Sequence, residues 1–147
     1  MPPVSLVATK QIDPGRLLPT PKPRSLRLLI VEDHADTSAS LQLLLGLYGF
    51  EVQAATDGPT ALEMAGEFHP EVVLLDIGLP GMNGYEVARR LRAECPSQPP
   101  FLVAITGYGR EEDRLRSERA GIDLHLLKPT DPKQLIVLLQ RFQSVVR

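Results

Sequence analysis

The stretch EVVLLDIGLPGMNGYEV, residues 71–87, decides the fold of this chain. Its four consecutive apolar residues, 72–75, run directly into Asp76, and a loop containing glycine and proline follows at once. A short apolar run bounded by turn residues is typical of a strand that is buried on both faces of a parallel sheet. The stretch therefore predicts a buried strand, and it raises the question of why such a strand should end in a carboxylate.

Short apolar runs recur along most of the chain and alternate with amphipathic stretches such as 85–94, although the stretch 109–121 is very polar. The predicted strands are residues 26–31, 50–55, 71–76, 101–106 and 124–128. An alternation of strands and helices indicates a parallel sheet with helices on both faces. Right-handed crossovers then give a doubly wound, flavodoxin-like α/β fold of five strands and five helices, with strand order 2-1-3-4-5.

Helix signals fall between these strands and after the last one. Gly49 is expected to end the first helix, and Pro59 is expected at the first position of the second helix. Asp131 and Pro132 are expected as the N-cap and the first residue of the last helix. The apolar stripes of the first and last helices comprise, respectively, Leu41, Leu44, Leu45 and Tyr48, and Leu135, Leu138, Leu139, Phe142 and Val146.

Composition places the chain among ordinary globular proteins. Its 147 residues are enough for one domain with a hydrophobic core, and 43% of them are apolar and 23% charged. No apolar run approaches the roughly 20 residues of a membrane helix, and the N-terminus has no secretory signal pattern. Cys95 is the single cysteine, which excludes an internal disulfide and a thiol metal site. We expect a cytoplasmic protein without a membrane partner.

Residues 1–25 differ from the rest of the chain in composition and charge. They contain six prolines and carry a net charge of +3, which leaves −5 on the remainder, since the whole chain carries −2. Prolines at alternate positions favour an extended or disordered arm, so the folded domain is expected over residues 26–147. The arm is either a linker from a longer protein or a docking tail. The acidic body argues against a direct nucleic-acid partner.

Polar residues end four of the five predicted strands. Glu32 and Asp33 follow the first strand, Asp76 ends the third, Thr106 ends the fourth and Lys128 ends the fifth. In a doubly wound sheet, ligands bind outside the carboxyl ends of the strands. We therefore expect these five side chains to converge at one edge of the sheet.

Three carboxylates at one edge repel one another, because two charges about 4 Å apart cost about 4 kcal/mol at an effective dielectric of 20. A hard divalent cation such as Mg²⁺ prefers oxygen ligands and would compensate this charge. Lys128 adds a second positive charge, and Thr106 adds a hydroxyl donor. Such a set suits phosphoryl transfer, in which Asp76 can act as the nucleophile and form an aspartyl phosphate.

Four segments of the chain carry a resemblance to a known family. They are VED (31–33), LLDIGLPGMNGYE (74–86), AITG (104–107) and LLKP (126–129). In this order and spacing, and on this α/β pattern, the chain resembles the receiver domain of two-component response regulators, of which the chemotaxis regulators are one kind. The resemblance covers about residues 26–147.

By that resemblance, Asp76 is the phosphate acceptor, and Thr106 and Lys128 contact the phosphoryl group. The implied cofactor is Mg²⁺ or Mn²⁺. Its implied ligands are Glu32, Asp33, Asp76 and the backbone carbonyl of Gly78. The apolar strand is then a rigid support that fixes one nucleophilic carboxylate at the ligand edge of the sheet, which answers the question raised by residues 71–87.

Three further positions follow from the resemblance. The Lys128–Pro129 bond is expected in the cis isomer, as a structural feature. Gly78 stands two residues after the acceptor, where many receivers carry a side chain that borders the phosphate, so water is less hindered here. His125 stands where many receivers carry a tyrosine or phenylalanine that swings inward on activation. Thr106 and His125 are thus the implied switch residues, and an imidazole is able to respond to pH near neutrality.

The resemblance also implies an output surface, which consists of the fourth helix, the fifth strand and the fifth helix and serves a downstream protein or a homodimer. On a helical wheel, Val137 points away from the core stripe of the last helix and Ile136 lies at its flank. Both residues are therefore expected at the surface. His34 and His69 are expected to have no functional role, since no histidine pair has helical metal-ligand spacing.

The sequence thus predicts a signalling switch of a two-component phosphorelay. The chain would catalyse only its own phosphorylation and dephosphorylation, with phosphohistidine of a histidine kinase or histidine phosphotransfer protein as the donor. Two alternatives stay open. One is a receiver-like interaction module that works without phosphorylation. The other is a phosphohydrolase with an aspartyl intermediate. Such enzymes usually carry a second catalytic carboxylate two residues after the nucleophile, and Gly78 at that position argues against this alternative. The chain is expected to be a stand-alone receiver or part of a longer protein such as a hybrid kinase.

Overall fold

The computed structural model describes residues 25–79, 81–107 and 111–146, with side chains left out at 111–114 and 146. Apart from Ser25, the predicted proline-rich arm lies outside the described residues. The strands are β2 (Arg27–Val31), β3 (Glu51–Ala55), β4 (Val72–Asp76), β5 (Phe101–Thr106) and β6 (Leu124–Leu127). The helices are α1 (Ala35–Leu47), α2 (Gly58–Phe68), α3 (Gly84–Glu94), α4 (Glu111–Arg119) and α5 (Pro132–Val146). Within the described residues, no helix is long and apolar enough to span a membrane.

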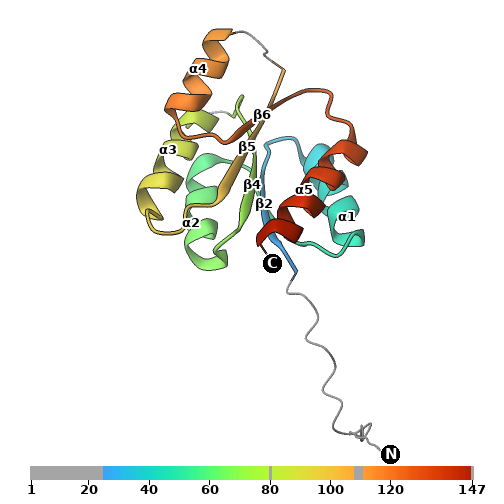
Figure 1. Ribbon diagram of the computed structural model, residues 1–147. Helices are drawn as coiled ribbons and strands as arrows, with labels where there is room; N and C mark the ends of the chain where they lie inside the picture. The colour runs from blue at the N-terminus through green and yellow to red at the C-terminus, as the bar shows by residue number, and fades with distance from the viewer. Residues whose placement is uncertain (1–24, 80, 108–110, 147) are drawn as a thin grey trace, which may run out of the picture.

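The strands form one parallel sheet in the order β3-β2-β4-β5-β6. Counted along the described chain, this is the predicted order 2-1-3-4-5, which is confirmed. Helices α1 and α5 lie on one face of the sheet, and α2, α3 and α4 lie on the other (Figure 1). The chain is therefore doubly wound, and the carboxyl ends of all its strands face the same edge.

Strand β4 shows why the sequence adopts this fold. All five of its residues are buried, as the apolar run predicts. Val73 and Leu75 belong to a core cluster with residues of α2 and α3, whereas Val72 and Leu74 belong to a second cluster with residues of α1 and α5. Because successive strand residues point to opposite faces, a continuous apolar run is what a strand between two helical layers requires.

Several predicted helix ends are confirmed. Gly49 has a φ of +89°, in the left-handed region that favours glycine, and it follows the C-cap of α1. The Asp131 carboxylate accepts a hydrogen bond from the backbone N–H of Lys133 at 3.0 Å and so caps α5. The first residue of α2 is Gly58 rather than Pro59, which takes the second position after the N-cap Asp57.

Besides that of Pro59, two predicted placements are wrong. Tyr48 is the C-cap of α1 and is 53% exposed, because the helix ends before it completes the predicted apolar stripe. Ile136 is only 5% exposed and belongs to the core cluster on the α1 and α5 face, whereas Val137 is 46% exposed as predicted. A core-facing stripe wider than about 100° takes in two consecutive residues, here Leu135 and Ile136.

Candidate functional site

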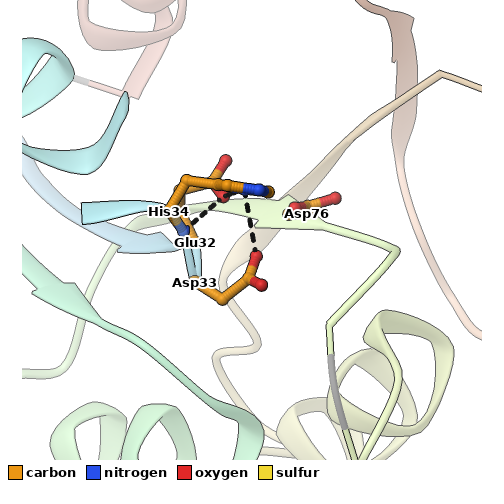
Figure 2. A group of neighbouring side chains, drawn as sticks. All are labelled: Glu32, Asp33, His34 and Asp76. Atoms are coloured by element: carbon orange, nitrogen blue, oxygen red, sulfur yellow. Dashed lines mark hydrogen bonds and ion pairs between the residues drawn. The ribbon is translucent and has the colours of Figure 1, made fainter. Parts of the chain in front are cut away.

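Three carboxylates lie together at the carboxyl edge of the sheet (Figure 2). Glu32 and Asp33 directly follow β2, and Asp76 is the last residue of β4. Strands β2 and β4 are neighbours in which Val31 pairs with Leu75, so the two strands end side by side. One ligand atom from each carboxylate, together with one from His34, lies within 4.8 Å of the others. The predicted acidic group is thus brought together.

The backbone and burial fix two of these carboxylates firmly. Glu32 is 5% exposed and Asp76 is 7% exposed, and both lie in the rim of the core. The backbone N–H of Glu32 donates to the carbonyl of Ala55 at 3.0 Å, and that of Gly78 donates to Asp76 Oδ1 at 3.0 Å. Asp33 is more open, with 30% of its side chain exposed. The cluster therefore has a buried inner side and an open outer side.

Lys128 supplies positive charge to the inner side of the cluster. Its Nζ lies 3.4 Å from Asp76 Oδ2, and 39% of the lysine side chain is exposed. The backbone N–H of Lys128 donates to the carbonyl of Thr106 at 2.8 Å, which ties the residue to the end of β5. The Lys128–Pro129 bond is cis, as predicted. The lysine is therefore held by the backbone with its ammonium group directed at the predicted acceptor.

Thr106 is the last residue of β5 and is 2% exposed. Its neighbour Ile105 pairs with Asp76 across the sheet, so Thr106 lies one residue beyond the acceptor. This position matches the predicted convergence at the carboxyl edge. The loop that follows Asp76 is anchored beside it, since the Gly84 N–H donates to the Ile77 carbonyl at 3.1 Å. A Cβ on Gly84 would lie 2.8 Å from Ile77 Cα, so this close approach requires glycine.

The two departures from the family pattern have different surroundings. A Cβ on Gly78 would lie 3.8 Å from Asp76 Oδ1, an ordinary contact, so a side chain here would border the carboxylate. His125 pairs with Ala104 in the sheet, and its Nδ1 lies 3.4 Å from the Ser117 hydroxyl of α4. The imidazole of His125 is therefore directed at α4. Its predicted switching stays a prediction.

His34 belongs to the cluster, although it was expected to have no functional role. Its Nδ1 lies 2.9 Å from Glu32 Oε2 and 3.4 Å from Asp33 Oδ1 (Figure 2). The hydrogen bond with Glu32, and then the charges of Asp33 and Glu32, raise the pKa of His34 above its usual value. The sequence signal for this position is that His34 directly follows the acidic pair Glu32 and Asp33. The spacing of histidine pairs on a helix carries no information about such a neighbour.

A hollow of about 440 Å³ opens beside the cluster, between α1 and α5. Glu32, Asp76 and Lys128 line its polar end, and the apolar side chains include Leu41 and Leu135. The carboxylate oxygens at this end are hard donors of the kind that a divalent cation with several bound waters prefers. The residues present therefore fit a Mg²⁺-type site.

Comparisons with known proteins point in the same direction. The family described as "Response regulator receiver domain" matches residues 28–140. The response regulator PleD of Caulobacter vibrioides is 35% identical over 123 residues, which are 84% of this chain and 26% of PleD. The phosphate regulon transcriptional regulatory protein PhoB of Escherichia coli is 34% identical over 121 residues, which are 82% of this chain and 52% of PhoB.

A solved structure shares the fold. The crystal structure of a CheY-like response regulator receiver domain protein from Methanospirillum hungatei matches with a TM-score of 0.75 at 28% identity. The match covers 82% of this chain and 94% of that chain. By contrast, the chain spans only about a quarter of PleD and about half of PhoB.

Proposed function

Because the chain belongs to the response regulator receiver family, we propose that Asp76 is the phosphoacceptor of a two-component signalling switch. One observation carries the proposal. The Asp76 carboxylate, 7% exposed, has two other carboxylates within 4.8 Å and the ammonium of Lys128 at 3.4 Å. A buried carboxylate in this setting is a nucleophile poised for a reaction that brings in positive charge and a phosphoryl group.

The donor is phosphohistidine of a histidine kinase or a histidine phosphotransfer protein. An Asp76 carboxylate oxygen forms a bond to phosphorus as the bond between phosphorus and the donor imidazole breaks. The bonding electron pair leaves with that imidazole, which takes up a proton from solvent. The product is an acyl phosphate on Asp76, and the chain catalyses no turnover on other substrates.

The chain's own residues have separate roles in this step. Glu32, Asp33, Asp76 and the carbonyl of Gly78 would hold a divalent cation. When bound, that cation supplies positive charge for the phosphoryl oxygens. The Gly78 N–H orients the Asp76 carboxylate through its hydrogen bond at 3.0 Å. Lys128 is able to follow the new phosphoryl group, because its long side chain is 39% exposed.

The response to phosphorylation is proposed to run through Thr106 and His125 to the face that consists of α4, β6 and α5. Each of these elements presents at least one large apolar side chain to solvent. Leu115 of α4 is 44% exposed, Leu127 of β6 is 51% exposed and Val137 of α5 is 46% exposed. Such residues suit a downstream protein or a homodimer partner. We place this switch in the cytoplasm, where kinases present phosphohistidine.

The test is phosphorylation of the purified chain by phosphoramidate with Mg²⁺. We expect acid-labile phosphate on the wild type, none on Asp76→Asn, and normal labelling of Asp36→Asn, which removes an exposed carboxylate of α1. Equal labelling of wild type and Asp76→Asn would contradict the proposal. No labelling of either, with binding to a partner intact, would favour the interaction module that works without phosphorylation.

A further inference from the structure

We propose that His34 supplies a nitrogen ligand to the cation site, so that this site discriminates in favour of divalent transition cations that bind imidazole, such as Ni²⁺ and Zn²⁺. The inference rests on the proposed function, since it takes the metal site at Glu32, Asp33 and Asp76 as its starting point. It concerns which ion that site selects. Oxygen ligands alone would leave Mg²⁺ and Mn²⁺ as the expected occupants.

The spacing of the donor atoms carries the inference. His34 Nδ1 lies 2.9 Å from Glu32 Oε2 and 3.4 Å from Asp33 Oδ1. Around a cation with bonds of about 2.1 Å, adjacent ligands are about 3.0 Å apart in octahedral and about 3.4 Å apart in tetrahedral geometry. A cation would take the place of the hydrogen atom between the imidazole and the carboxylates, with no rearrangement of the backbone.

The local structure gives His34 no competing structural role. It is the N-cap residue of α1, yet its side chain makes no capping hydrogen bond. Of its side chain, 71% is exposed, so the ring contributes little to the core. Its backbone N–H donates to Glu32 Oε2 at 2.9 Å, which holds the residue against the carboxylate. The imidazole is therefore positioned by the main chain while its only polar contacts among the described residues are the two acidic side chains.

The chemistry of the donor set determines what the nitrogen changes. Mg²⁺ prefers oxygen ligands and keeps several waters, so replacing one of these waters by an imidazole adds little to its affinity for the site. Ni²⁺ and Zn²⁺ bind imidazole well. His34 should therefore raise the ratio of Ni²⁺ affinity to Mg²⁺ affinity. If the ring merely blocked the carboxylates, its removal would instead raise the affinity for both ions by the same factor.

The experiment measures binding of Ni²⁺ and Mg²⁺ to the full chain by titration calorimetry. The variants are His34→Gln and a control, His69→Asn. His69 is an exposed residue at the C-cap of α2 with a φ of 52°, a conformation that asparagine tolerates. We expect Ni²⁺ affinity to fall at least about tenfold in His34→Gln, Mg²⁺ affinity to change less than about twofold, and His69→Asn to match the wild type.

A second readout identifies the ligand directly. In the Co²⁺-loaded wild type, proton NMR should show a strongly shifted exchangeable resonance of a metal-bound imidazole, and His34→Gln should lack it. The inference would be overturned if wild type and His34→Gln bound Ni²⁺ with equal affinity, or if the substitution raised the affinity for both ions equally. In either case, Mg²⁺ binding to the wild type would leave the proposed function intact. Absence of any cation binding to the wild type would overturn the inference together with the metal site of the proposed function.

Discussion

Two carboxylates on the α3 side of the molecule, Glu86 and Asp123, are paired with arginines, whereas three carboxylates at the carboxyl edge of the sheet are crowded against one another. Glu86 contacts the guanidinium groups of Arg89 and Arg90, and Asp123 Oδ1 lies 2.7 Å from Arg92. At the edge, three carboxylates share Lys128 and His34 among the side chains that the structure describes. The carboxylates of the first region are neutralised by their arginine partners, whereas those of the second region still require additional positive charge.

This difference separates charges that support the fold from charges that support function. A carboxylate with a guanidinium and a backbone donor contributes to stability in the resting molecule. A carboxylate that faces like charge costs stability until a ligand neutralises it, which is a common property of functional sites. Removing a charge should therefore have opposite consequences for stability in the two regions.

The largest effect is expected in the paired region, at Asp123. Its Oδ2 accepts from the backbone N–H of Leu102 at 2.8 Å, while Oδ1 pairs with Arg92. Asp123→Ala leaves the Leu102 N–H without this acceptor, so urea denaturation should show a loss of about 2 to 3 kcal/mol. Asp123→Asn keeps an acceptor oxygen and should lose less than half as much. Equal losses in both variants would mean that the ion pair dominates.

The opposite sign is expected at Asp76. Two repulsions over at most 4.8 Å outweigh one attraction over 3.4 Å by about 2 kcal/mol at an effective dielectric of 20. Asp76→Asn removes these terms and keeps an oxygen for the Gly78 N–H. In the absence of divalent ions, its free energy of unfolding should therefore exceed that of the wild type by about 1 to 2 kcal/mol. A less stable Asp76→Asn would contradict the view that this cluster is unfavourable by itself.

A divalent cation should neutralise the carboxylates at the carboxyl edge and so remove the difference in charge compensation between the two regions. Mg²⁺ at ten times its dissociation constant stabilises the wild type by about 1.4 kcal/mol, which corresponds to about 3 to 5 °C in the melting temperature. Asp76→Asn should show a smaller shift, because the site has lost a ligand charge. Asp123→Asn should show the full shift, since it leaves the site unchanged. Thermal unfolding with Mg²⁺ and with Na⁺ at matched ionic strength distinguishes binding from screening.

Regular patterns predicted the fold because each element has its own signal. The five apolar runs between turn residues indicated the strands, and the position of Asp76 at the end of one run indicated the edge where charges meet. Convergence of Glu32, Asp33, Asp76 and Lys128 was therefore predictable from sequence alone.

Features that depend on side-chain direction were not predictable in this way. Ile136 is buried because α5 presents two consecutive residues to the core, which a narrow helical stripe excludes. His34 points back onto the acidic pair because of the extended conformation at the N-cap of α1, with φ −83° and ψ 113°. Neither the period of the helix nor the composition of the segment specifies that direction.

The smallest effect is expected at Glu86, a paired carboxylate on the surface of α3. Hydrogen bonds from Arg89, and then from Arg90, lower the pKa of Glu86 below its ordinary value of 4.5. Because the pKa is lower in the folded than in the unfolded state, the charge pairing stabilises the fold at pH values above the unfolded-state pKa. This stabilisation is lost as the pH falls through the folded-state pKa. Glu86→Gln should therefore melt about 1 to 3 °C below the wild type near neutral pH.

The difference between wild type and Glu86→Gln should shrink as the pH falls through the lowered folded-state pKa of Glu86, below which the wild-type carboxylate is also neutral. It should also shrink in high salt, because an exposed pair is screened. The substitution leaves the backbone N–H of residue 86, which donates to Asn83 Oδ1 at 3.0 Å, so the helix cap is retained in the variant. A difference that persisted at low pH would show that side-chain packing, rather than the charge pairing that distinguishes this region from the carboxyl edge, stabilises the wild type at this position.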